Sequence, residues 1–326
     1  MQRRDFVTLL GSRAVLWPLR ALAQQPVMPV IGFLNGAWPQ GYAHYVAAFR
    51  QGLKEAGYVE GENVAIDYRW AEGRYEQLPA LAAELIRLNP TVIAATSTPA
   101  AVVAKAATTT IPVVFTSASD PVQLGLVSQM RRPDGNVTGV SQMNVEVAPK
   151  RLELAHELAP TATTVALLVN PTDPNTETLS TQLAMAAQAL ALKLHIVHAR
   201  NEREIDEAFA TVAPLRVGAL VIGTDAYFNS RSKQLGALTL QYAIPTIYQY
   251  REFSVDGGLI SYGGNITESY RMAGVYAGRI LKGEKPSDLP VQQVTKVELI
   301  VNLKTAKTLG IEIPTALLVR ADEVIE

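Results

Sequence analysis

The sequence of 326 residues contains no cysteine, and this absence excludes several kinds of chemistry. Disulfide bonds, thiol catalysis, zinc sites with cysteine ligands and a lipid anchor on an N-terminal cysteine all require that residue. Histidine is scarce as well, with only four residues. His44 and His156 fall on expected helices, and His195 and His198 point to opposite faces of an expected strand. None of them has the spacing of a metal site, and we expect neither a metal nor a cofactor.

Catalytic sequence motifs are missing too. The chain contains no G-x-S-x-G, Walker A, G-x-G-x-x-G or H-E-x-x-H pattern. The formal net charge is −1 and no strongly basic run occurs, so the composition does not support nucleic-acid binding. Hydrophobic residues make up 48% and charged residues 18%, as in a soluble protein with a sizeable core. These features favour a binding protein and argue against an enzyme.

The first 23 residues have the layout of an export signal. A twin-arginine pair, Arg3 and Arg4, precedes a mildly apolar stretch at residues 7–22, and Ala21 and Ala23 supply the small residues that a signal peptidase reads. The stretch is too short and too charged to form a stable membrane span. We therefore expect a Tat-like signal, cleaved after Ala23, and a periplasmic location. The alternative is a short N-terminal helix.

From residue 30 onward, short β-branched runs alternate with stretches of helical periodicity. The expected strands are residues 30–34, 64–68, 92–95, 113–115, 165–169, 194–197, 219–222, 246–248 and 258–262. The expected helices are residues 42–56, 77–88, 99–108, 124–130, 148–158, 176–191, 204–212, 230–242 and 267–281. Strands that alternate with single helices form mostly parallel sheets. Because the rhythm restarts after Gly139, we predict an α/β protein of two doubly wound parallel-sheet lobes.

The loops after the strands are the expected place for a ligand, because open α/β sheets bind ligands beyond the carboxyl ends of their strands. These loops are rich in small hydroxyl residues and tyrosine and poor in His, Lys and Arg. The candidate ligand-binding residues are Asn35, Ser97, Thr98, Ala100, Ala101, Ser117, Ala118, Ser119, Asp120, Asn170, Asp225, Tyr227, Tyr248 and Glu252.

Ser97 and Thr98 precede a proline, which is the pattern of a capped helix start. We expect the free N–H groups of Ala100 and Ala101 to face the cleft, where a helix N-terminus binds a carboxylate or phosphate without a basic side chain. The residues around Asp120 repeat the pattern after the next strand. The alternative is that both segments are ordinary helix caps.

Two acidic residues and several tyrosines complete the candidate site. Asp225 and Glu252 are candidates to pair with a ligand amine, or else they are a helix cap and a solvated loop charge. Tyr227, Tyr248 and Tyr250 are candidates to stack on an aromatic or apolar ligand, or else they pack within a lobe.

Several sequence blocks together resemble the substrate-binding proteins of ABC transporters, of the TrpX type. The blocks are GLKEAGYVEGENV at residues 52–64, TPAA at 98–101, DPVQLGLV at 120–127, GNVTGV at 135–140, TD at 224–225 and ILKGEKPSDLPV at 280–291. The resemblance implies a type I periplasmic-binding-protein fold whose lobes are joined by a hinge of three chain crossings. It implies a first lobe of residues 26–139 plus 265–293 and a second lobe of residues 140–264 plus 294–326. It also implies ligand contacts in the loops at residues 97–101 and 117–120 and at Asp225.

The expected function is therefore the periplasmic solute-binding component of an ABC importer. The ligand would be small, carboxylate-bearing and amino-acid-like or aromatic, and the partner would be a membrane permease. Nucleic acid and membrane insertion are not expected, and the chain should be a monomer. The residues after Asp225 differ from those usual in the family, so the resemblance does not determine the identity of the ligand. The alternatives are a ligand-sensing receptor domain that serves a signalling partner, and an enzyme on the same fold.

Overall fold

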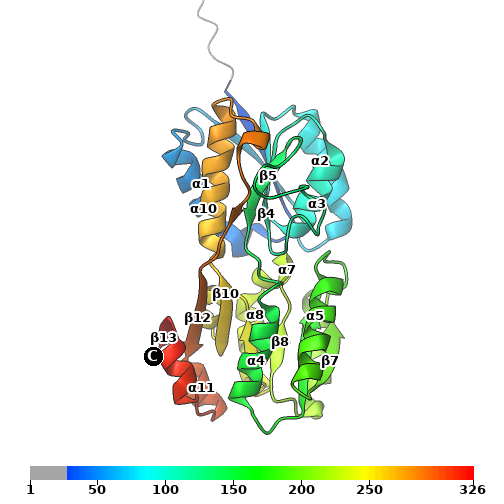
Figure 1. The fold of residues 1–326 in the computed structure, drawn as a ribbon, viewed down its shortest axis with the longest axis vertical. Helices are drawn as coiled ribbons and strands as arrows, with labels where there is room; N and C mark the ends of the chain where they lie inside the picture. The colour runs from blue at the N-terminus through cyan, green and yellow to red at the C-terminus, as the bar shows by residue number, and fades with distance from the viewer. Residues whose placement is uncertain (1–27) are drawn as a thin grey trace, which may run out of the picture.

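The computed structural model describes residues 28–326 and shows two α/β lobes stacked along the long axis of the molecule (Figure 1). The upper lobe in the figure combines the blue and cyan N-terminal part of the chain with an orange segment near the C-terminus, and the lower lobe carries the green, yellow and red segments. The predicted export signal at residues 1–23 lies outside the described residues, as do residues 26 and 27 of the predicted first lobe.

The first lobe is built on a six-stranded sheet of order β11-β5-β4-β3-β1-β2, in which every neighbouring pair is parallel. Its strands are β1 (Val30–Asn35), β2 (Ala65–Trp70), β3 (Val92–Ala95), β4 (Val113–Ser117), β5 (Val137–Ser141) and β11 (Gln292–Gln293). Helices α1 (Pro39–Glu55) and α10 (Ile266–Leu281) pack together on one face, and α2 (Leu78–Arg87) and α3 (Thr98–Ala107) cover the other. The 3₁₀ helices η1 (Tyr75–Gln77) and η3 (Pro286–Asp288) complete the lobe.

The second lobe contains a seven-stranded sheet of order β13-β12-β10-β9-β8-β6-β7, parallel except for the β10–β12 pair. Its strands are β6 (Thr164–Val169), β7 (Lys193–His198), β8 (Leu220–Ile222), β9 (Thr246–Tyr248), β10 (Ile260–Gly264), β12 (Val297–Asn302) and β13 (Glu323–Ile325). Its helices are α4 (Ala148–Leu158), α5 (Thr176–Ala189), α6 (Glu202–Val212), η2 (Ala213–Leu215), α7 (Ala226–Asn229), α8 (Ser232–Gln241), α9 (Arg251–Val255), α11 (Leu303–Leu309) and α12 (Thr315–Arg320).

The chain passes between the two sheets three times: from β5 to α4, from β10 to α10, and from β11 to β12. The prediction of two doubly wound lobes joined by three crossings is therefore confirmed. The residue limits of the lobes stay a prediction.

Three predicted segments around the cleft differ from the structure. Residues 124–130 do not form a helix; the chain turns there, and Gly125 has a φ of +66°, a conformation that interrupts a helix. The predicted helix at residues 230–242 matches α8, but the predicted loop before it contains the short helix α7, which Asp225 starts with its side chain. The predicted loop after β9 contains the short helix α9.

Helices α1 and α10 approach each other so closely that the contact requires glycine. A Cβ added to Gly52 would lie 1.8 Å from the carbonyl oxygen of Arg271, and a Cβ on Gly274 would lie 2.0 Å from that of Phe49. Both approaches are far shorter than a van der Waals contact. The pair joins a helix from the start of the chain to one that follows the second crossing, so it holds the discontinuous first lobe together.

We expect Gly274→Ala to lower the free energy of unfolding by about 1–3 kcal/mol, the usual cost of overpacking. The sign of this change in the free energy of unfolding is diagnostic, because alanine in a helix interior otherwise stabilises a protein by roughly 0.5–1 kcal/mol relative to glycine. Urea denaturation measures the change. Ala47→Ser on the exposed face of α1 is the control and should change stability by less than about 0.5 kcal/mol. A stabilising Gly274→Ala would contradict the close packing.

Candidate functional site

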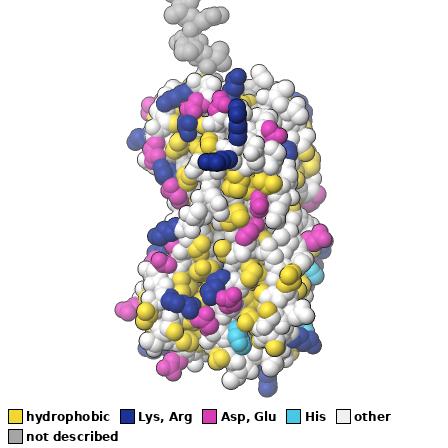
Figure 2. Space-filling view, in the orientation of Figure 1, with side chains coloured by type: hydrophobic (Ala, Val, Ile, Leu, Met, Phe, Trp, Pro, Cys, Tyr) yellow, Lys and Arg dark blue, Asp and Glu magenta, His cyan; other side chains and the backbone are white. Residues whose placement is uncertain are grey.

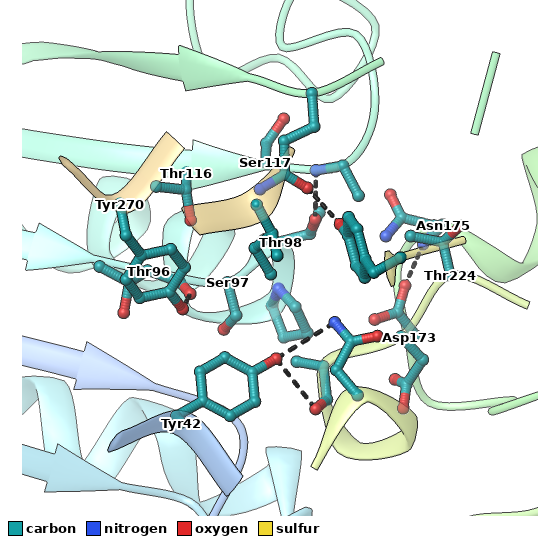
Figure 3. Close-up of a pocket in the computed structure, with 18 residues that line it drawn as sticks. Tyr42, Thr96, Ser97, Thr98, Thr116, Ser117, Asp173, Asn175, Thr224 and Tyr270 are labelled. Carbon is teal, nitrogen blue, oxygen red and sulfur yellow. Dashed lines mark hydrogen bonds between the residues drawn. The ribbon is translucent and has the colours of Figure 1, made fainter. Parts of the chain in front are cut away.

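A cavity of about 30 Å³ lies between the two lobes. It is lined from both sides, by residues of the first lobe and of the second (Figure 3). The lining residues are Tyr42, Thr96, Ser97, Thr98, Pro99, Thr116, Ser117, Ala118, Gln142, Asp173, Asn175, Thr224, Asp225, Ala226, Asn229, Tyr250, Ile266 and Tyr270. The set includes two aspartates and no Lys, Arg or His.

The start of α3 presents hydroxyl groups to this cavity. Ser97 is the N-cap, and its Oγ accepts from the N–H groups of Gly36 at 3.1 Å and Ala100 at 3.4 Å. The Oγ1 of Thr98 accepts from the N–H of Ala118 at 3.1 Å. Because both hydroxyl oxygens already accept hydrogen bonds within the protein, their protons are free to donate to a ligand. The dipole of α3 favours an anion at the same end.

The prediction that free N–H groups of Ala100 and Ala101 face the cleft is wrong. The N–H of Ala100 donates to the Ser97 side chain, and that of Ala101 donates to the Ser97 carbonyl oxygen at 2.8 Å. Both amides are used inside the first turn, and neither residue lines the cavity.

The second predicted helix start, around Ser119 and Asp120, is also wrong. No helix begins there, because the chain enters the turn that contains Gly125. The Oγ of Ser119 donates to Oδ1 of Asn175 across the lobes at 2.5 Å. The N–H of Asp120 donates to Oε1 of Glu146 at 2.9 Å. Ser119 and Asp120 therefore support the rim of the cleft and do not line the cavity.

Asp225 links the two lobes. It is the N-cap of α7, where its Oδ1 accepts from the N–H of Phe228 at 2.9 Å. Its Oδ2 accepts from the hydroxyl of Tyr75, in the first lobe, at 2.7 Å and from Nδ2 of Asn170 at 3.2 Å. The predicted residue Asn170 thus orients Asp225 from outside the cavity lining. Both oxygens of Asp225 have protein partners, as the helix-cap alternative requires.

One carboxyl oxygen of Asp173 is not used as a hydrogen-bond acceptor. Asp173 is 5% exposed, its Oδ1 accepts from the N–H of Asn175 at 2.8 Å, and its buried Oδ2 accepts no hydrogen bond in the described chain. In its protonated form Asp173 can donate to the carboxylate of Asp225. Burial raises the pKa of Asp173 well above its ordinary value, and the neighbouring charge of Asp225 adds to the shift. Figure 3 shows Asp173 and Asn175 on the second-lobe side of the cavity. Asp173 is therefore a buried carboxyl group that can accept a donor from a ligand.

Tyrosines form much of the remaining wall. The hydroxyl of Tyr42 donates to the carbonyl oxygen of Ala226 in the other lobe at 3.1 Å and accepts from Nδ2 of Asn229 at 3.2 Å. The hydroxyls of Tyr250 and Tyr270 donate to protein oxygens as well. With these hydroxyls satisfied, the rings offer apolar and aromatic surface to a ligand body.

Of the predicted site residues, the structure brings six into the cavity lining: Ser97, Thr98, Ser117, Ala118, Asp225 and the candidate stacking residue Tyr250. Asn35 donates instead to the Thr96 carbonyl oxygen at 2.8 Å, behind the lining. Tyr248 is fully buried in the second lobe, where its ring stacks on Phe253 at 4.8 Å between centroids. Glu252 lies on α9, and its Oε1 is 4.0 Å from Nε2 of His44 in the first lobe. The tyrosine at 227 packs at the cleft edge.

Sequence reasoning missed lining residues of two kinds. Asp173 and Asn175 lie in the loop after β6, so the rule that points to strand-end loops could have found them had it been extended past Asn170. Tyr42 and Tyr270 lie on helices α1 and α10, and no local signal distinguishes them from core residues.

An arginine and two aromatic rings close the edge of the cleft. The guanidinium of Arg231, in the second lobe, lies 5.4 Å from the Trp38 ring of the first lobe and 5.2 Å from the Tyr227 ring of its own lobe. Tyr227 in turn packs so closely on Gly73 of the first lobe that a Cβ there would lie 2.7 Å from its ring. Together with the hydrogen bonds of Asp225, Tyr42 and Ser119, these contacts describe a closed pair of lobes.

Residues 38–325 match the family described as ABC transporter substrate binding protein. The chain belongs to this family. The resemblance seen in the sequence blocks is therefore confirmed over almost the whole described chain. Proteins of this family bind a small molecule and deliver it to a transporter permease, and they are extracellular or periplasmic.

Individual relatives support the same fold. A tyrosine-binding protein of Clostridioides difficile (strain R20291) is 27% identical over 81% of this chain and 76% of its own length. The ABC domain of Streptococcus pneumoniae in complex with L-Trp is 26% identical, with a TM-score of 0.80 over 90% of this chain and 100% of that one. The ligand-free, open structure of a substrate-binding protein with adhesive properties from Clostridium difficile is 27% identical, with a TM-score of 0.62 over 91% and 99%.

The difference between these TM-scores concerns the lobe arrangement. The two structures match this chain with nearly equal identity and coverage, yet the L-Trp complex superposes much better than the open structure. The substrate-binding protein described here is thus arranged more like the ligand-bound relative, in agreement with its interlobe contacts. These relatives also confirm the type I periplasmic-binding-protein fold.

The described residues also bear on metal binding and on membrane insertion. Within residues 28–326, no three His, Asp or Glu side chains come together as a set of metal ligands. None of the helices in the same residues has both the length and the apolar character needed to span a bilayer. On the face shown in Figure 2, basic and acidic side chains are interspersed over both lobes.

We expect Arg231→Ala to shift the ligand-free protein toward the open state. The variant loses cation–π contacts worth roughly 0.5–2 kcal/mol, which changes the ratio of closed to open molecules several-fold or more. Small-angle X-ray scattering should show a larger radius of gyration for the variant without ligand. Arg203→Ala is the matched control, because Arg203 pairs only with Glu207 on the exposed face of α6. Equal radii for both variants would contradict the role of Arg231.

We expect Asp173→Asn to stabilise the ligand-free protein at neutral pH, because asparagine keeps the acceptor for the Asn175 N–H and removes a buried acid next to Asp225. A folded-state pKa that is raised means that the wild type loses stability as pH rises through that pKa. The difference in Tm should therefore be near zero below the ordinary pKa of aspartate and should grow as pH rises. About 1 kcal/mol corresponds to a shift of roughly 2–4 °C for a domain of this size.

Thermal unfolding at a series of pH values measures this effect. The control is Asp120→Asn, at a carboxyl group that does not line the cavity. A Tm of Asp173→Asn that stays below the wild-type Tm at every pH would show that the carboxylate itself stabilises the closed structure.

Proposed function

We propose that this protein is the periplasmic solute-binding component of an ABC importer for an α-amino acid with an aromatic or large apolar side chain, and that it performs no chemistry on its ligand. The observation that carries the proposal is that the Oδ2 of Asp173 accepts no hydrogen bond, although it is buried beside a cavity whose lining has no basic side chain. A buried carboxyl oxygen that accepts no hydrogen bond is the natural acceptor for a ligand ammonium group.

The opposite wall suits a carboxylate. Ser97 and Thr98 each have a hydroxyl proton free to donate, and both stand at the positive end of α3. The anion site inferred from the sequence is thus kept, but side-chain hydroxyls take the place of the backbone amides of Ala100 and Ala101. An α-amino acid carries its two charges only a few ångströms apart, so one molecule can reach Asp173 in the second lobe and Thr98 in the first.

The rest of the wall receives the side chain of the ligand. Tyr42, Tyr270 and Ile266 supply aromatic and apolar surface on the first-lobe side, and Tyr250 supplies it on the other. The printed names of two relatives, a tyrosine-binding protein and a complex with L-Trp, support an aromatic amino acid. We propose the ligand class on this combined basis.

Closure explains how binding becomes transport. A ligand shifts the protein toward the closed form only as far as it binds that form more tightly than the open one. In the closed form, each polar group of an amino acid would have a partner in one lobe or the other. The closed molecule would then be the form that the permease receives. We further propose that the chain works as a monomer, contacts no nucleic acid and is exported by the twin-arginine segment at residues 1–23.

Isothermal titration against L-tyrosine, L-tryptophan and L-phenylalanine tests the proposal. At least one should bind, and its N-acetyl derivative, which lacks the ammonium charge, should bind about 10- to 100-fold more weakly, as expected for the loss of a charged hydrogen bond of ~1.5–3 kcal/mol. Asp173→Asn should weaken the amino acid similarly, although it stabilises the ligand-free protein.

The affinity should also depend on pH. Asp173 must be ionised to pair with an ammonium group, and its pKa is raised in the ligand-free protein, so affinity should fall as pH drops through that raised value. Asp173→Asn should lose most of this dependence. Thermal stabilisation by uncharged sugars alone, with no response to any amino acid, would refute the proposed function.

A further inference from the structure

The second lobe contains a fully buried arginine directly behind the cavity wall. Arg151, on α4, has no exposed surface and is the largest side chain buried to this degree. Its Nη1 donates to the carbonyl oxygen of Tyr262 at 3.0 Å, and its Nη2 donates to the carbonyl oxygen of Asn144 at 2.6 Å. Asn144 belongs to the first crossing between the lobes, and Tyr262 to the strand that leads into the second. Arg151 therefore sits where the hinge meets the second lobe.

The charge of Arg151 is not neutralised by its contacts. All three of its acceptors are neutral oxygens, the third being Oγ1 of Thr224 at 3.2 Å, and its Nε has no partner in the described chain. Burial lowers the pKa of Arg151 to about 10, so the guanidinium keeps its proton at neutral pH. A buried cation is costly, and the nearby charge of Glu146 offsets part of that cost without a hydrogen bond to Arg151. A ligand anion would offset more of it.

Thr224 carries the effect of this cation into the cavity. It is 3% exposed and lines the cavity, where Figure 3 shows it beside Asn175. Because Oγ1 accepts from Arg151, the hydroxyl proton of Thr224 must point away from the guanidinium. The hydroxyl group of Thr224 is thus oriented to donate a hydrogen bond, like those of Ser97 and Thr98 on the opposite wall. Of these three hydroxyl groups, that of Thr224 is the one that accepts from a cationic side chain.

We propose that Arg151 is a positioning residue for the ligand carboxylate. It holds the Thr224 hydroxyl as a donor, and it adds positive potential, on the second-lobe side, to a cavity lined by two aspartates and no basic side chain. This inference rests on the proposed function and names how the same site selects an acid. The carboxylate would then be held from both lobes, by Ser97 and Thr98 on one side and by Thr224 on the other, while the ammonium group pairs with Asp173.

The test compares an aromatic L-amino acid with its carboxamide, which keeps the ammonium group and the side chain but lacks the acid charge. For the wild type, the ratio of the two Kd values measures selectivity for the carboxylate. Arg151→Met should reduce this ratio at least about tenfold, the scale of a lost charge-assisted interaction, whereas Arg151→Lys should retain most of it. A purely structural arginine would lower Tm and weaken both ligands equally.

A second pair of variants keeps the test decisive if Arg151→Met does not fold. Thr224→Val removes the hydroxyl and preserves the shape of the side chain, and Thr224→Ser retains the hydroxyl. Valine should reduce the carboxylate ratio and serine should not. Adding Arg151→Met to Thr224→Val should cause a smaller loss than Arg151→Met causes alone, because part of the effect of Arg151 acts through Thr224. If Thr224→Val or a folded Arg151→Met keeps the wild-type ratio of the two Kd values, the inference is overturned. The proposed function then remains intact. If the wild type binds no amino acid, both proposals fall.

Discussion

The structure depends on the Asp225 carboxylate, which joins the two lobes while it starts a helix. One of its oxygens caps α7, and the other receives the Tyr75 hydroxyl from the first lobe. A carboxylate that accepts several hydrogen bonds in a buried place is held in one orientation. Because Thr224 precedes it and Ala226 follows it, this fixed point sets the positions of the hydroxyl beside Arg151 and of the carbonyl group that meets Tyr42.

Around this point, the cavity separates two kinds of polar group. The second lobe contributes the spare oxygen of Asp173, and the first lobe contributes hydroxyl protons at the start of α3. Such a division suits a ligand with one positive and one negative group, and it places the two poles on opposite sides of a hinge. Ligand binding and lobe closure are therefore parts of one equilibrium. The buried Arg151 extends the same arrangement from the cavity wall to the hinge strands.

Much of the fold could be predicted from local patterns. Alternating buried strands and amphipathic helices are properties of neighbouring residues, so the two series of elements were recognisable. The helix expected at residues 124–130 failed because helical periodicity does not reveal the turn at Gly125. In the site, Ser97, Thr98 and Asp225 follow strands and could be found. Asp173 also follows a strand. That its Oδ2 accepts no hydrogen bond can be known only from the positions of all neighbouring donors in the folded chain.

By itself, the sequence determined the class of fold, the family and the strand-end loops that face the cleft, because periodicity, capping residues and short motifs are encoded locally. Only the tertiary structure decided which polar groups remain free. The amides of Ala100 and Ala101 are consumed by the Ser97 cap, whereas Asp173, Tyr42 and Tyr270 come together from distant segments and different lobes. The availability of a hydrogen-bonding group depends on what lies across space from it, and three chain crossings determine that proximity.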